Sequence, residues 1–172
     1  MTAPAPAGLA VYEPEHDALT FHVLGTATPQ GSGRVIRGVL ITKTPALSYW
    51  RSQVAERGER AMLDAGLDTL DGPIGVGLVF RLPMPATRPA WQRALGQLPA
   101  WRRPDLDKLE RAVLDGLTDG GVYRDDGQVT RLTATKDEHA VGWLGVSVTV
   151  WRVPMPEQPP RGRRPSAPRV LP

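Results

Sequence analysis

Two pairs of acidic residues lie close together in the sequence. They are the residues that most clearly indicate a site for chemistry. Asp105 and Asp107 occur in RPDLDKLERAVLDGL, and Asp125 and Asp126 follow in VYRDDGQV. Carboxylate oxygens suit a hard cation such as Mg²⁺, which proteins usually bind with one or two carboxylates while water and substrate phosphates complete the coordination. Two carboxylates separated by one residue, then a helix and a second acidic pair, therefore predict a magnesium site.

The first acidic pair falls at the start of a predicted helix that begins at Asp105 and ends near Gly120 and Gly121. Residues two apart inside a regular helix do not face each other. At the cap position, however, Asp105 can turn its carboxylate away from the helix while Asp107 occupies the first turn. Asp115 lies four residues after Arg111, and for Asp115 we favour a salt bridge along the helix. Apolar residues form one stripe that we expect to face a sheet: Leu106, Leu109, Val113 and Leu117.

Each acidic residue also has an ordinary structural interpretation. Asp105 alone is a typical helix N-cap, and Asp107 in the first turn interacts favourably with the helix dipole. Asp125 and Asp126, followed by Gly127, are typical of a turn before a strand. The joint occurrence of both pairs nevertheless favours the metal site.

The charges are unevenly distributed along the chain. The chain has 21 basic and 18 acidic residues, and the excess of +3 resides in residues 154–172, so the remainder is formally neutral. No acidic residue occurs in residues 18–55 or 72–104, and both segments carry several cations. This segregation is consistent with a basic surface around an acidic site, but by charge alone two ordinary basic loops on a solvated face are the better explanation.

Composition excludes several classes of protein. The chain contains no cysteine, which rules out thiolate zinc sites, cysteine nucleophiles and disulfides and is compatible with a reducing compartment. The N-terminus lacks the cationic start and apolar run of a secretory signal. No stretch approaches the ~20 apolar residues of a membrane helix. We expect a cytoplasmic protein without a membrane partner.

Periodicity predicts an α/β (α+β) fold with a single domain. Thr44 and Pro45 are a favourable cap and first residue for a helix ending at Gly66. Strict alternation of apolar residues over residues 74–82 indicates a strand with one buried face. We expect a mixed β-sheet of about four to five strands packed by two main helices. The expected strands are residues 18–24, 35–42, 74–82, 129–136 and 141–153.

The domain organisation predicted from composition has three parts. Residues 1–17 are expected to form a flexible arm, residues 18–153 the folded domain, and residues 154–172 a disordered tail rich in proline and arginine. Residues 83–104, which contain Trp91 and Trp101, are expected to form a long loop.

The segment from Arg103 to Lys136, together with TPQGSGR near the start, resembles the RusA-like Holliday junction endonucleases. The shared pattern is D-L-D, a helix, a glycine turn and D-D-x-Q-V with a downstream lysine. The resemblance implies a homodimeric, Mg²⁺-dependent endonuclease selective for branched DNA. It would cut paired strands at four-way junctions in DNA recombination and repair, with Mn²⁺ as a substitute cation.

The resemblance also implies roles for individual residues. Asp105, Asp107 and Asp126 match the metal-binding carboxylates. Arg111 stands where the family has a catalytic lysine; an arginine keeps the positive charge but is too basic to transfer a proton. The residues expected to support this site are Asp125, Asp115 and Lys108, and those expected to contact DNA are Arg34, Arg37, Arg102, Arg103 and Lys136.

Two alternatives remain open at this stage. One is a nuclease of a phage or mobile element that acts on flaps or other branched DNA. The other is a catalytically inactive junction-binding protein, which the arginine at position 111 makes worth testing.

Overall fold

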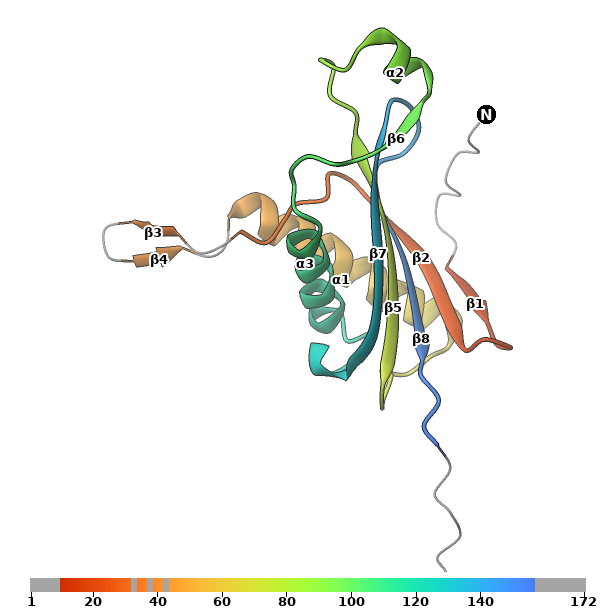
Figure 1. Ribbon diagram of the computed structural model, residues 1–172. Helices are drawn as coiled ribbons and strands as arrows, with labels where there is room; N and C mark the ends of the chain where they lie inside the picture. The colour runs from red at the N-terminus through yellow and green to blue at the C-terminus, as the bar shows by residue number, and fades with distance from the viewer. Residues whose placement is uncertain (1–9, 32–33, 37–38, 42–43, 157–172) are drawn as a thin grey trace, which may run out of the picture.

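The centre of the molecule is a mixed six-stranded sheet (Figure 1). The computed structural model describes residues 10–31, 34–36, 39–41 and 44–156. Within this sheet β5 and β7 pair in parallel, and the other neighbouring strands that the structure describes pair antiparallel. The predicted mixed sheet is confirmed, with six strands rather than four or five. The strand order is β1 (Val11–Glu13), β2 (Ala18–Leu24), β8 (Gly145–Arg152), β5 (Ile74–Pro83), β7 (Val129–His139) and β6 (Gln97–Pro99).

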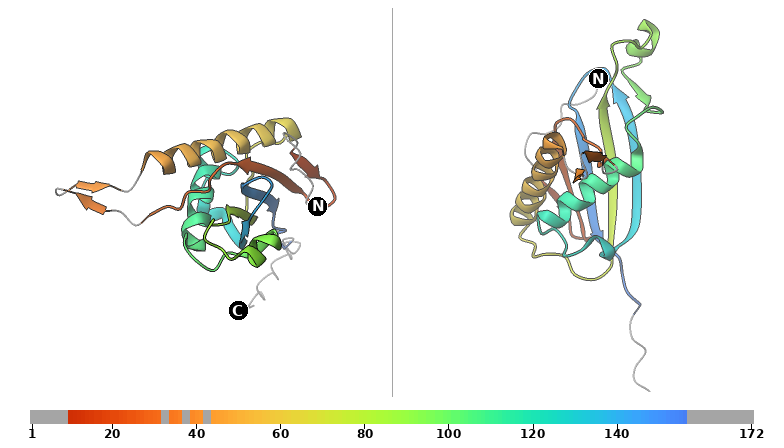
Figure 2. Two further views of the ribbon diagram at one scale, coloured as in Figure 1. Left: turned by 90° about the horizontal axis from the view of Figure 1, so that it is seen from above. Right: turned by 90° about the vertical axis from the view of Figure 1, so that its left-hand side faces the viewer.

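Two helices cover one face of this sheet, so the predicted α+β class is confirmed (Figure 2). They are α1 (Pro45–Ala65) and α3 (Leu106–Asp119). The apolar stripe predicted for α3 is largely correct, since Leu109, Val113 and Leu117 are fully buried. None of the helices in the part of the chain that the structure describes is long and apolar enough to cross a bilayer.

Strand alternation sets which side chains enter the core. In β5 the apolar residues predicted to face inward are all buried, from Ile74 to Leu82. Val146, Val148 and Val150 of β8 are buried beside them. Successive side chains of a strand point to opposite faces, so one row of each strand meets α1 and α3 while the other row lies on the opposite face.

Helix α1 begins and ends where the sequence predicts. The hydroxyl of Thr44 accepts a hydrogen bond from the amide of Leu47 at 3.2 Å, and Pro45 occupies the first turn. Gly66 ends the helix at φ 65°, a left-handed conformation that glycine adopts without a steric penalty. Trp50 is buried in the core at the N-terminal half of the helix.

The two helices approach each other closely at glycines. A Cβ atom at Gly116 would lie 2.7 Å from Cβ of Val54, and one at Gly120 would lie 2.4 Å from the carbonyl oxygen of Ala55. A Cβ at Gly58 would meet Val122 at 2.8 Å. Glycine inside a helix costs about 1 kcal/mol relative to alanine. The position of Gly58 is explained by this close packing.

We expect Gly120→Ala to lower the free energy of unfolding by about 1–3 kcal/mol, because the new methyl group meets backbone atoms that no rotamer change can move. Chemical denaturation monitored by circular dichroism measures the change. Gly31→Ala is the matched control, since a Cβ there meets nothing within 4 Å. Equal stability of the two variants would contradict the close contact.

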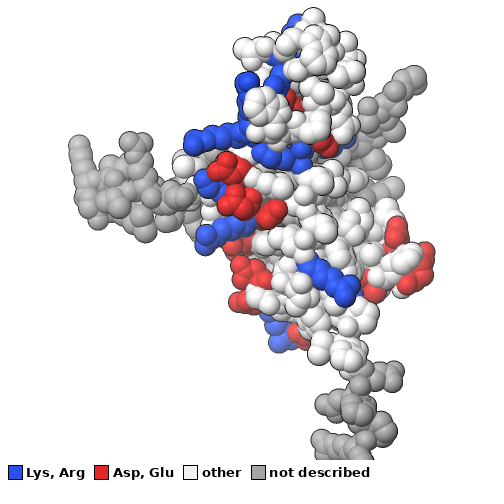
Figure 3. All heavy atoms as spheres, in the orientation of Figure 1, with Lys and Arg blue, Asp and Glu red and all other residues white. Residues whose placement is uncertain are grey.

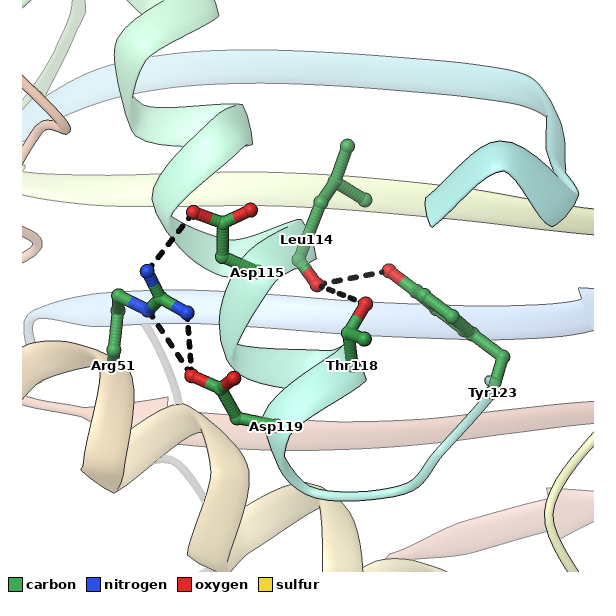
Figure 4. A network of polar contacts seen from close by, with 6 residues as sticks. All are labelled: Arg51, Leu114, Asp115, Thr118, Asp119 and Tyr123. Atoms are coloured by element: carbon green, nitrogen blue, oxygen red, sulfur yellow. Dashed lines mark hydrogen bonds and ion pairs between the residues drawn. The ribbon is translucent and has the colours of Figure 1, made fainter. Parts of the chain in front are cut away.

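An arginine links the two helices at the opposite end of α3 from Asp105 (Figure 4). The Arg51 guanidinium donates to Asp115 at 3.0 Å and to Asp119 at 2.6 and 3.1 Å. The interpretation of Asp115 as the partner of Arg111 is therefore wrong: its carboxylate is paired with α1. Nearby, the hydroxyl of Tyr123 donates to the carbonyl oxygen of Leu114 at 3.2 Å.

Short elements differ from the sequence prediction. The segment 83–104, expected to be a loop, contains α2 (Ala90–Ala94) and β6, and it projects beyond the sheet (Figure 1). The segment expected as one strand over residues 35–42 is a hairpin of β3 (Arg34–Ile36) and β4 (Val39–Ile41). Three-residue strands are too short for periodicity to detect, which explains these errors.

Candidate functional site

Asp105 is the N-cap of α3, but its carboxylate makes no capping hydrogen bond. Instead, its Oδ2 accepts from the ammonium of Lys108 at 2.7 Å. The carboxylate is therefore not bound to the helix backbone but is paired with a side chain of the first helical turn. The hydrogen bond and charge of Lys108, with smaller contributions from Arg103 and Lys136, hold the pKa of Asp105 below its usual value. Asp105 is therefore an anion at neutral pH.

Asp107 lies exposed on the first turn of α3. Glu110, one turn further on, is half-buried, and burial together with the charge of Asp107 raises the pKa of Glu110. Our sequence analysis did not identify Glu110. The sequence feature that could have identified it is its position three residues after Asp107, since residues three apart on a helix lie on the same side. The start of α3 thus carries three carboxylates, two of them from the predicted pair.

Cations surround this end of α3. In Figure 3 basic and acidic side chains lie next to each other along the side of the molecule that carries α3. Arg103 and Arg111 are exposed, and Lys108 is half-buried. Pro29, Gly31, Arg103, Pro104, Asp105 and Lys108 line an open pocket. An anionic ligand such as a phosphate can enter a pocket of this composition next to Asp105.

The second acidic pair forms the short helix η1 (Asp126–Gln128) and its cap. Oδ1 of Asp125 accepts from the amide of Gly127 at 2.7 Å, and Oε1 of Gln128 accepts from the amides of Arg124 and Asp125. The alternative of a turn-forming role for Asp125 is confirmed. Asp126 is exposed, and among the described residues its carboxylate has no hydrogen-bond or ion-pair partner.

The two acidic pairs lie at opposite ends of α3 (Figure 1). The helix has 14 residues, which at 1.5 Å per residue separates its ends by roughly 21 Å. In the parts of the chain that the structure covers, no group of three or more His, Cys, Asp or Glu residues could hold a metal ion. Within one copy, therefore, Asp126 does not join Asp105 and Asp107.

A family model described as Endodeoxyribonuclease RusA matches residues 25–150, which include both acidic pairs and the helix between them. The chain belongs to this family. RusA endonucleases act on branched DNA and resolve Holliday junctions. A search of curated proteins finds no significant match.

The RusA match also includes the segment expected to contact DNA. Arg34 lies in β3, where only the backbone is described, and Arg37 lies outside the described residues. The preceding loop contacts the acidic site, because the amide of Gln30 donates to the carbonyl oxygen of Lys108 at 2.9 Å. The loop that ends at Gly31 therefore lies next to the start of α3.

A buried ion pair contacts the segment that precedes α3 in this RusA-family chain, and sequence analysis missed it. Arg88 donates two hydrogen bonds to Glu138, at 2.8 and 2.6 Å. Its guanidinium also lies 5.6 Å from the ring centre of Trp101, a side chain that is 71% exposed. The exposed Arg102 lies over the same ring at 4.6 Å. No periodicity predicts such a pair, because its partners are 50 residues apart.

Proposed function

We propose that this chain is a cytoplasmic, Mg²⁺-dependent endonuclease that resolves four-way DNA junctions by paired phosphodiester hydrolysis in recombination and repair. The observation that carries this proposal is the arrangement at the start of α3. There, two carboxylates are free of capping interactions, and cations are close enough to bind phosphate. Membership of the RusA family supports DNA cleavage as the activity of this site.

A complete three-carboxylate metal site does not fit within one copy, because the acids lie at opposite ends of α3. We therefore infer a homodimer in which Asp105 and Asp107 of one copy and Asp126 of a second copy would hold Mg²⁺. A bound Mg²⁺ would lower the pKa of a coordinated water molecule and neutralise charge on the scissile phosphate. Two such sites suit a junction, which needs two cuts related by two-fold symmetry.

The edge of the sheet supports this arrangement. β6 pairs only with the last residues of β7, from Asp137 to His139. Among the described residues, the outer edge of β7 before Lys136 has no neighbouring strand, and Leu132 is 40% exposed on it. An unpaired edge is a template for another strand.

Antiparallel pairing of this edge of β7 with the same edge of a second copy fits the separation of Asp126 from Asp105 and Asp107. Two-fold pairing places the start of each β7 opposite the end of the other. Asp126 immediately precedes β7, while Lys136 near the end of β7 contacts the segment that leads into Asp105. The second copy would thus bring its Asp126 toward Asp105 and Asp107.

The chain's own cations provide the remaining chemistry. Arg111 lies one turn after Asp107, and its permanent charge would stabilise the negative charge that develops on the phosphate during cleavage. Lys108 holds Asp105 and adds positive charge at the same place. Arg34, Arg37, Arg102 and Arg103 are proposed to bind flanking phosphates, which makes affinity fall steeply with salt.

Cleavage of a panel of synthetic substrates tests this proposal. With Mg²⁺, we expect symmetrical paired nicks in four-way junctions and little cutting of flaps, forks or linear duplexes, mapped to nucleotide resolution. Mn²⁺ should restore cutting after chelation. Preferential cutting of flaps would identify a branched-DNA nuclease instead. Tight junction binding without cleavage in either metal would identify a binding protein, which the arginine at position 111 makes a specific alternative.

A further inference from the structure

The ammonium of Lys136 makes two short hydrogen bonds to backbone carbonyl groups. It donates to the carbonyl oxygens of Arg102 and Pro104, both at 2.7 Å. An ammonium has three hydrogens, so at most one remains for another partner. Lys136 is half-buried in β7, and both carbonyls belong to the segment that leads directly into α3.

The same residue binds this segment through its backbone. The carbonyl oxygen of Lys136 accepts from the amide of Ala100 at 3.1 Å. Residues 100, 102 and 104 are thus all attached to one residue of the sheet. Asp105 follows immediately, and its carbonyl oxygen accepts from the amide of Leu109 at 3.2 Å to begin α3. Lys136 therefore contacts the segment through which the chain enters this helix.

Arginine could not replace lysine in this contact without a change of geometry. The lysine ammonium is a compact donor whose hydrogens point in tetrahedral directions, whereas the guanidinium is a planar fork. Two carbonyl oxygens that belong to residues two apart both approach one nitrogen at 2.7 Å. A phosphate contact, by contrast, accepts either cation, and arginine often binds phosphate better because it can donate two parallel hydrogen bonds.

We propose that Lys136 is a positioning residue of the nuclease site, which holds the segment before α3 so that Asp105 and Asp107 keep their places, rather than a phosphate contact. This inference rests on the proposed function for its kinetic readout but not for its structural one. Loss of Lys136 lowers the rate of cleavage on bound DNA by much more than it lowers affinity for the junction, because Arg103 and the other exposed cations keep their charges.

Two variants, Lys136→Arg and Lys136→Met, are compared with Arg103→Gln as the matched control for a phosphate contact. We expect both Lys136 variants to cut four-way junctions at least about 10-fold more slowly at saturating protein, as for a misplaced catalytic group. The salt dependence of their junction binding should equal that of the wild type, because no phosphate contact is removed, and their Kd should change less than that of Arg103→Gln. Arg103→Gln should weaken binding and reduce the salt slope by about 1.

Hydrogen exchange of the free protein gives the structural readout without metal or DNA. Amides of residues 101–109 should exchange faster in Lys136→Met than in the wild type. In Arg103→Gln they should exchange at the wild-type rate. Weaker binding with a smaller salt slope in Lys136→Met, restored by Lys136→Arg, would overturn the proposal in favour of a phosphate contact. Unchanged exchange would also overturn it. A wild-type protein that cuts no substrate would refute the proposed function and leave the exchange result to decide on Lys136.

Discussion

Asp107→Asn should reduce junction cleavage by at least about 100-fold, because even the outer partners of metal ligands contribute 10- to 100-fold to metal affinity or activity. The substitution preserves the size of the side chain and removes only its charge. Binding should be unchanged or tighter, since one negative charge near the DNA phosphates disappears. Single-turnover cleavage in Mg²⁺ and gel-shift titration without metal measure the two effects separately.

The matched control for this variant is Asp64→Asn, which removes an exposed carboxylate of α1 that pairs with Arg60. It should cut at the wild-type rate. If Asp107→Asn also cut normally, the start of α3 would not be the site of hydrolysis. If it instead lost binding together with cleavage, the carboxylate would have a structural role.

Mixing two inactive variants should restore cleavage if each site is shared between two copies. In a heterodimer of Asp107→Asn with Asp126→Asn, one site carries both substitutions and the other carries none. Random pairing at equal concentrations therefore leaves about one quarter of all sites intact. If each site lay within one chain, both sites of every heterodimer would be defective, and the mixture would remain inactive.

The experiment uses the two chains with different tags, expressed together and purified by both tags in turn, so that only heterodimers remain. Restored activity should appear as single nicks rather than paired cuts, because one site per dimer works. Dimers of each variant alone, purified in the same way, give the background. No increase above that background would contradict the shared site and the pairing of β7 edges that we infer from the structure.

Much of the fold follows from local sequence, since the features that define it act over one or two turns. Thr44, Pro45 and Gly66 fix the ends of α1 through capping, and the alternation in β5 fixes its buried face. The position of Asp105 at the cap of α3 was likewise predictable from the local sequence. Short strands such as β6 are defined by their partner in the sheet, which lies 40 residues away in the chain.

The relative positions of the acids were less predictable. The family resemblance implied that Asp126 joins Asp105 and Asp107, although the predicted helix between them already implied a separation of roughly 20 Å. The partner of Asp115 depends on how α1 crosses α3, and no pattern within α3 encodes it. The role of Lys136 depends on backbone carbonyls, whose location in space is set by the chain path alone.

The glycines between α1 and α3 have a consequence for how activity tolerates substitution. At Gly120 the helices touch through main-chain atoms, so no side chain there can be repacked to absorb extra volume. A bulkier residue must displace α3 as a unit, and the carboxylates at its far end move with it. A substitution at Gly120, far from the carboxylates, would then slow catalysis because it changes the orientation of α3. This effect would occur even in molecules that remain fully folded.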